Sequence, residues 1–202
     1  MSDYKVIAEV GESLSNIFWE EIHADPDIAG LITNQSLISL ESPAEHQENN
    51  DNSLLSIYLY RITEDAQRKN DFPVTGNGGR LRKPPMALDL NYLITPLLKD
   101  PRDQQIVLGK IMQVLYDRPT LEGADLAGSL GSSGEQVRVI FNPVSLEEIS
   151  RVWQALETSY RLSVCYTIRV TLLDSTREVD AVRVLSQTTR YEGKSPASLS
   201  MS

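Results

Sequence analysis

The chain has 202 residues, enough for one substantial core, and its 41% hydrophobic and 23% charged residues are typical of a globular protein. Its formal net charge of −9 argues against a general nucleic-acid binder, because such proteins hold phosphates with clustered lysines and arginines. No apolar run reaches the length of a signal peptide or a membrane span, so we expect folding in the cytoplasm and no membrane insertion.

The first predicted element is an amphipathic helix within residues 3–22, which should end before the sequence ADPDIAG. Its apolar residues recur at spacings of three and four: Ile7, Val10, Leu14, Ile17, Phe18 and Ile22. Residues 30–40 then predict a strand and residues 41–53 a polar loop. A second strand is predicted over residues 54–62, which are rich in β-branched and aromatic side chains.

Residues 63–85 show no apolar period and contain Asn-Gly, Gly-Gly and Pro-Pro pairs, so they predict a long loop. The segment concentrates positive charge on an acidic protein, in Arg68, Lys69, Arg80, Arg82 and Lys83. It is either an arm that contacts a partner or a mobile loop. Its TGNGGRLRK sequence lacks the third glycine of a dinucleotide fingerprint and the Gly-Lys-Ser/Thr of a P-loop, so it predicts no phosphate site.

Residues 86–94 alternate and predict a half-buried strand, and a helix follows with Asp100 as N-cap and Pro101 in its first position. The apolar stripe of that helix is expected to comprise Leu108, Ile111, Met112 and Leu115. Gly109 lies inside this predicted helix, where glycine has a low helix propensity. We expect its missing side chain to permit close packing of the helix against the sheet. Residues 121–135 predict a Gly- and Ser-rich connector, or a short turn of helix supported by its leucines, before a strand at 136–141.

A capping box of Ser145 and Glu148 predicts the start of the next helix, and Val144 and Ile149 form a hydrophobic staple there. Its core-facing residues are expected to be Leu146, Ile149, Val152, Trp153 and Leu156.

Residues 160–173 predict a long strand whose apolar face would pack on the core. Its other face carries Arg161, Ser163, Thr167, Arg169 and Thr171 and would meet water or a partner. A return strand is expected at 179–185. We therefore expect one domain over residues 1–185 and a flexible tail over 186–202.

Hairpin-like links mix with helical connections in this order of elements. The sequence therefore predicts an α+β domain with a mixed, largely antiparallel sheet that carries helices mainly on one face.

No group of residues predicts catalysis. Cys165 is the single cysteine, and His23 and His46 are the only histidines, without the spacing of metal ligands. We therefore expect no enzyme, no catalytic or metal-binding residues and no cofactor, and favour a binding or structural role.

Three segments together, PPMALDLNYLITPL, VLGKIMQVLYDRPTLEG and VSLEEISRVWQALETSYRLSVCYTIRV, resemble the N-terminal domain of the cap, or tail-terminator, proteins of phage-tail-like contractile injection systems. The resemblance implies a tail-terminator-like fold and a hexameric ring that closes the distal end of the inner tube and the contractile sheath. It implies as partners further copies of the chain, the tube protein, the sheath protein and, in some systems, a second cap paralogue. The protein would then become part of the injection particle.

Candidate contact surfaces are the polar strand face with Arg161 and Arg169, the segment from Arg68 to Lys83, and the C-terminal tail. The rival interpretation is a head–tail joining or tail-completion adaptor of a phage, which would also be an acidic ring former.

Overall fold

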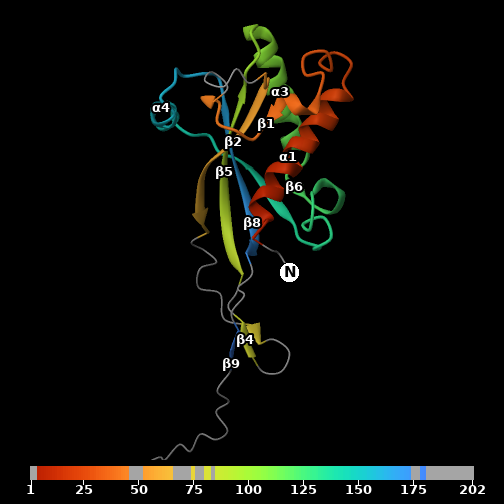
Figure 1. The fold of residues 1–202 in the computed structure, drawn as a ribbon, viewed down its shortest axis with the longest axis vertical. Helices are drawn as coiled ribbons and strands as arrows, with labels where there is room; N and C mark the ends of the chain where they lie inside the picture. Colours follow the sequence, from red (N-terminus) through yellow and green to blue (C-terminus); the bar gives the residue numbers. More distant parts are fainter. Residues whose placement is uncertain are drawn as a thin grey trace, which may run out of the picture.

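The computed structural model describes residues 4–45, 52–65, 74–75, 80–82, 85–173 and 178–180. Its helices are α1 (Val6–His23), α3 (Pro101–Asp117) and α4 (Leu146–Ala155), with short 3-10 turns at Gln35–Leu37 and Gly123–Asp125 (Figure 1). Its strands are β1 (Ile38–Ser39), β2 (Leu55–Glu64), β3 (Val74–Thr75), β4 (Arg80–Arg82), β5 (Met86–Pro96), β6 (Thr120–Leu121), β7 (Val137–Phe141), β8 (Val164–Leu173) and β9 (Glu178–Asp180).

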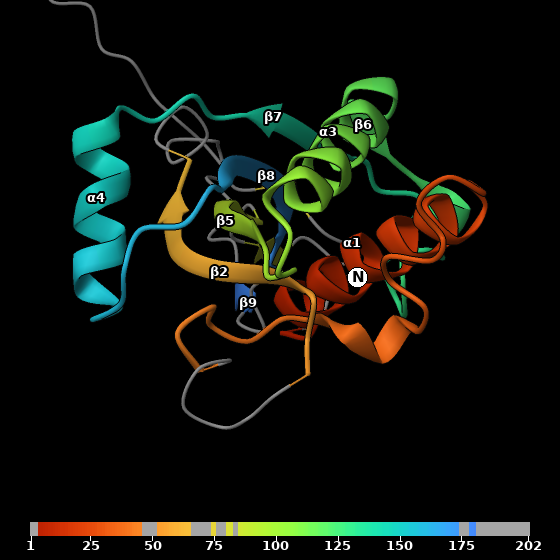
Figure 2. The same ribbon diagram turned by 90° about the horizontal axis from the view of Figure 1, so that it is seen from above.

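Six strands form the main sheet in the order β1-β2-β5-β8-β7-β6. Only the short β1–β2 pair is parallel, and the other neighbouring pairs are antiparallel. Seen from above, α1 and α3 lie on one side of the sheet and α4 on the other (Figure 2). The prediction of an α+β fold with a largely antiparallel sheet and helices mainly on one face is confirmed.

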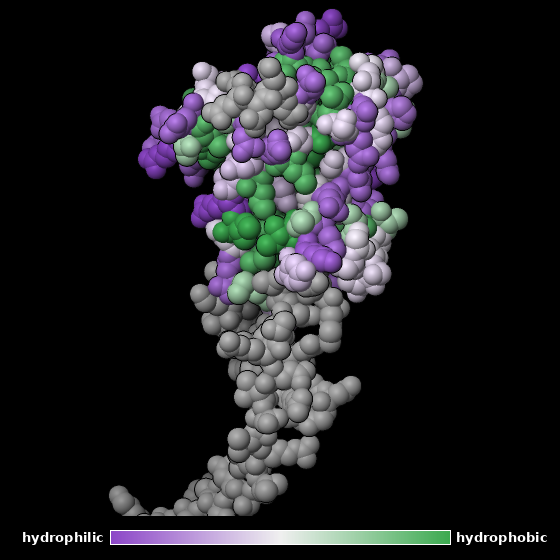
Figure 3. Space-filling model, viewed as in Figure 1, coloured by the Kyte–Doolittle hydropathy of each residue, from purple (hydrophilic) through white to green (hydrophobic). Residues whose placement is uncertain are grey.

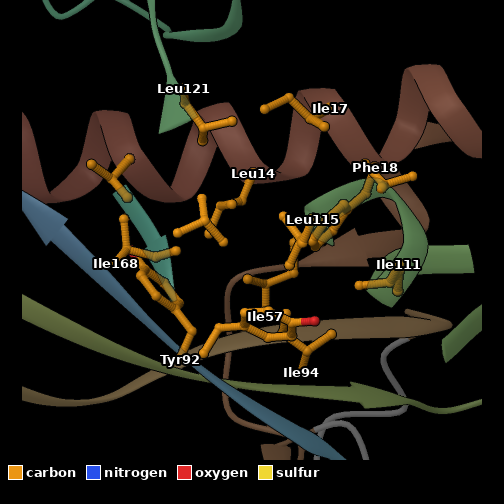
Figure 4. Close-up of a cluster of buried hydrophobic side chains, with 14 of the residues drawn as sticks. Leu14, Ile17, Phe18, Ile57, Tyr92, Ile94, Ile111, Leu115, Leu121 and Ile168 are labelled. Atoms are coloured by element: carbon orange, nitrogen blue, oxygen red, sulfur yellow. The ribbon is translucent and has the colours of Figure 1, made fainter. Parts of the chain in front are cut away.

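The main core lies between the sheet and the helices α1 and α3. The first helix contributes the buried residues Leu14, Ile17 and Phe18, of which Leu14 and Phe18 point toward the strands (Figure 4). The sheet and α3 complete this core with Ile57, Tyr92, Ile94, Ile111, Leu115, Leu121 and Ile168. The predicted stripe of α1 is therefore confirmed, with Ile7 partly buried and packed against the same cluster.

The opposite face of the sheet carries a smaller core under α4. Ile149 and Trp153 of that helix pack against Leu93 and Cys165, and Val144 packs against the same cluster. Both faces of β5 are consequently covered from Asn91 to Pro96, so the expectation of a half-buried strand was wrong for that end. The alternating pattern failed there because Leu93 lies among apolar neighbours on the second face.

The capping predictions are confirmed. Asp100 accepts a hydrogen bond from the backbone of Arg102, and Ser145 and Glu148 form both bonds of a capping box. The predicted helix stripes contain two errors, since Met112 of α3 and Leu146 of α4 are exposed. Val107 and Val114 fill the core positions of α3 instead.

Two further local predictions were wrong. Residues 30–40 form turns and a two-residue strand, because the Asn34 side chain accepts a hydrogen bond from the Ser36 backbone and starts a 3-10 turn. The strand expected at 160–173 begins only at Val164. The chain leaves α4 through Glu157, whose φ of 54° lies in the left-handed region, and Tyr160 and Leu162 are exposed before the strand starts.

The segment expected to be a long loop contains paired strands. β3 pairs with β4, and β4 pairs with β9 in a second, three-stranded sheet. The return strand after β8 is described over residues 178–180 and pairs there with β4. Strands of two or three residues are too short to show a repeating apolar period. Residues 181–202 lie outside the described part, and the domain boundary at 185 stays a prediction.

Candidate partner-binding surfaces

The polar face of β8 is the first candidate surface, and Arg169 lies at its centre. Nε and Nη2 of Arg169 donate hydrogen bonds to the two carboxylate oxygens of Asp89 on β5, at 2.8 and 3.2 Å. Asp65 lies 3.4 Å from Nε of the same guanidinium. The hydrogen bonds to Asp89 raise the pKa of Arg169 above its ordinary value. Two carboxylates therefore balance the charge of this arginine and fix its orientation.

Next to Arg169 and Asp89 on this face, the cross-strand partners Thr167 and Asn91 are also polar and hydrogen-bonded to each other. The Thr167 hydroxyl donates to the side-chain oxygen of Asn91 at 2.9 Å, and the Asn91 amide donates to the backbone carbonyl of Arg61. The Arg61 side chain is exposed at the outer edge of the sheet. These hydrogen bonds hold the polar side chains of this face in fixed positions.

A groove of about 560 Å³ runs between α4 and this face of the sheet. Its walls include Tyr58, Tyr60, Val152, Leu156 and Cys165. Burial raises the pKa of the Cys165 thiol to about 11. Burial, followed by the electrostatic interaction with Cys165, raises the pKa of the Tyr60 hydroxyl to about 12. A thiol that stays protonated at neutral pH is a weak nucleophile, so Cys165 acts as a packing residue of the α4 cluster.

The other titratable candidates give no reactive arrangement. The His23 ring stacks on Trp19 with 4.8 Å between the ring centroids, and His46 lies outside the described residues. Within the described part of the chain, no three histidine, cysteine, aspartate or glutamate side chains gather as a metal site would need. Over the same residues, no helix combines the length and the apolar character of a membrane span.

The remaining predicted contact residues are only partly described. Arg161 is half-buried in the connection before β8. The register of the second sheet places Arg80 opposite Asp180 and Arg82 opposite Glu178. Arg68, Lys69 and Lys83 lie outside the described residues. The structure therefore brings acidic residues opposite two of these arginines, and contact with a partner stays a prediction for all seven.

Sequence reasoning missed the exposed apolar surfaces. One is a hollow of about 680 Å³ between α3 and β7, lined by Met112, Leu115, Tyr116, Val139, Phe141 and Tyr166. Ile62 of β2 and Leu40, which follows β1 beside α1, are also exposed. The helix period assigned Met112 to the core, and only the packing of α3 on the sheet shows that this side chain points away from it.

Comparisons with known proteins agree with this architecture. A family model described as the Pvc16 N-terminal domain matches residues 9–187. The fold is similar to that of the PVC sheath/tube terminator of an extracellular contractile injection system in its extended state, with a TM-score of 0.59 and 23% identity over 98% of this chain and 67% of that one. It is equally similar to the tube terminating cap of the anti-feeding prophage, with a TM-score of 0.59 and 24% identity over 98% of this chain and 66% of that one.

The chain thus spans about two thirds of the length of the two solved structures. No curated protein matches the sequence.

Proposed function

Because this chain belongs to the Pvc16 N-terminal domain family, we propose that it is a structural cap protein that terminates the tube and sheath of a contractile injection system. The observation that carries the proposal is the family match over residues 9–187. The fold shared with a sheath/tube terminator and a tube terminating cap supports it.

In this proposal six copies form a ring at the distal end of the particle. The ring ends growth of the inner tube and anchors the last ring of sheath subunits. Its partners are further copies of the chain, the tube protein and the sheath protein, with a second cap paralogue in systems that encode one. A closed ring of identical subunits needs two different contact surfaces on each copy. The polar face of β8 and the hollow between α3 and β7 are two such exposed surfaces.

Contacts to tube and sheath are assigned to the cationic residues Arg68, Lys69, Arg80, Arg82, Lys83, Arg161 and Arg169. The fixed geometry of Arg169 between Asp89 and Asp65 supports a specific contact over a diffuse electrostatic attraction. The role is non-enzymatic and requires no cofactor, no nucleic acid and no membrane insertion. The protein assembles in the cytoplasm and then remains part of the injection particle.

Deletion of the gene tests this function. Particles isolated from the deletion strain are measured by electron microscopy for the lengths of tube and sheath. The proposal predicts overlong naked tubes, or tubes that have lost their sheath, with normal lengths restored when the gene is supplied on a plasmid. A narrow and unchanged length distribution with intact sheath would contradict it.

A further inference from the structure

Two arginines on the α4 side of the main sheet have no carboxylate partner. Arg138 of β7 lies between the core residues Val137 and Val139, so its side chain is on the side of the sheet opposite the main core. Arg61 of β2 lines the groove under α4 on that same side. Both arginines are exposed, and within the described part of the chain neither forms an ion pair.

The surroundings of Arg138 favour an anion from another molecule. Arg138 is the cross-strand partner of Arg169, and like charges directly opposite each other destabilise a sheet. Asp89 and Asp65 lie against Arg169 and balance its charge, so they leave the charge of Arg138 without a counterpart. We call the surface formed by Arg61, Arg138 and the exposed Ile140 the cationic face.

The outer side of α1 carries the opposite charge. Its exposed residues Ala8, Glu12, Asn16 and Glu20 follow one another at intervals of four and form one line, which we call the α1 stripe. Figure 3 shows hydrophilic residues along α1, beside the hydrophobic residues that lie over the strands. Among the described residues, neither Glu12 nor Glu20 has a cation as an ion-pair partner. The α1 stripe therefore offers two carboxylates to another molecule.

The charges are similarly spaced on the two surfaces. The register places Arg61 and Ile140 in one row across β2, β5, β8 and β7, which is about 14 Å wide at about 4.8 Å per strand. Arg138 lies on the same side as Ile140, two residues before it. Glu12 and Glu20 are two intervals of four residues apart, or about 12 Å along the helix at about 1.5 Å per residue. A helix that lies across the strands can thus bring one carboxylate near each arginine.

We propose that the α1 stripe of one copy lies across the cationic face of the next copy, beside α4, with its two carboxylates against Arg61 and Arg138. The inference rests on the proposed ring and names a contact that builds it. α1 and α4 lie on opposite sides of the sheet, so the two surfaces differ and the contact is head-to-tail (Figure 2). The contact also covers Arg169, and it leaves the tube and the sheath to the other cationic residues assigned above.

A charge exchange between copies tests the contact. The acidic variant carries Arg61→Glu and Arg138→Glu, and the basic variant carries Glu12→Arg and Glu20→Arg. Either variant alone should lower the amount of chain bound to isolated particles several-fold, because every contact then joins like charges. The two variants expressed together should restore it, because they can alternate around a ring of six copies, and so should one chain with all four substitutions.

A matched control carries Lys99→Glu and Arg102→Glu, which change the net charge as the acidic variant does at exposed positions outside both surfaces. This control should bind particles as the unmodified chain does. Binding by either contact variant alone at the level of the unmodified chain would overturn the proposal. A loss that neither coexpression nor the fourfold variant restores would overturn it as well.

Cysteine crosslinking gives a second readout that leaves the four charges in place. In cells that assemble the particle, a chain with Asn16→Cys and Ile140→Cys should give a ladder beyond the dimer after treatment with a short bismaleimide. Either substitution alone should give none, and the unmodified chain controls for the reactivity of buried Cys165. Dimers from a single variant, or no ladder from the double variant, would overturn the head-to-tail contact.

Particle lengths from the same cells separate this contact from the proposed function. Normal lengths without a ladder reject the contact alone. A ladder without any control of length rejects the cap function alone.

Discussion

Ser129 donates two hydrogen bonds to the carboxylate of Glu9, from its backbone N–H at 3.1 Å and from its hydroxyl, across 120 residues of sequence. The backbone N–H of Leu130 donates to the other carboxylate oxygen at 3.2 Å. Burial by itself raises the pKa of Glu9, but these hydrogen bonds and the charge of Lys5 outweigh it and hold the pKa below its ordinary value. The first helix thus fixes the loop that joins β6 to β7.

Glu9→Gln should destabilise the fold by about 1–3 kcal/mol at pH 7, because a buried N–H of the loop then faces an amide donor in place of a carboxylate. The folded-state pKa of Glu9 is depressed, so its contribution is present above the unfolded pKa and is lost as the pH falls through the folded value. Urea unfolding of both proteins should therefore show a difference at pH 7 that shrinks toward pH 3. Glu12→Gln, on the exposed side of α1, is the control; a difference independent of pH would contradict this account.

Gly128→Ala should destabilise the chain more than Gly134→Ala does. Both glycines have positive φ, at 61° and 72°, so each substitution strains the backbone by about 1–2 kcal/mol. Only at Gly128 would the new Cβ also lie 2.6 Å from the Glu9 carboxylate, whereas nothing lies within 4 Å at Gly134. Thermal unfolding of the two variants measures the difference, and equal losses would show that the contact with Glu9 adds nothing.

Gly109→Ala should stabilise the chain by about 0.5–1 kcal/mol, because alanine has the higher helix propensity. Gly109 lies on the exposed side of α3, and an added Cβ would meet nothing within 4 Å. The expectation that this glycine permits close packing on the sheet was therefore wrong. A lower urea midpoint for the variant would indicate that the described environment of α3 is incorrect.

Trp153→Ala should cost about 3–5 kcal/mol, since the small core under α4 depends on this side chain. Trp153→Phe should cost clearly less, because the buried Nε1 of Trp153 has no hydrogen-bond partner within the described structure and its removal breaks no bond there. Chemical denaturation compares the two variants. Equal costs would point to an unseen partner for the indole N–H.

Most of the fold was predictable because its signals are local. The stripe of α1, the cap at Asp100 and the box formed by Ser145 and Glu148 each depend on residues within one or two turns of helix. The alternation of β8 was equally clear from Val164 onward. Each of these elements was predicted because its pattern reflects the geometry of the element itself.

The errors concern features that depend on distant packing. The burial of Leu93 and Asn91 on the second face of β5 depends on α4, which follows more than 50 residues later. The pairing of Arg169 with Asp89 likewise follows from the register of β5 and β8. The exposure of Met112 depends on how α3 lies on the sheet. A periodic pattern predicts which residues share an apolar face, but it does not show which other element packs against that face.

The most direct measurement of the cap function is to locate the chain on intact particles. An epitope tag on the chain, detected with gold-labelled antibody by electron microscopy, should mark one end of each particle only, and averaged density at that end should show six-fold symmetry. Label along the shaft or at both ends, or particles that lack the chain altogether, would contradict a terminating cap.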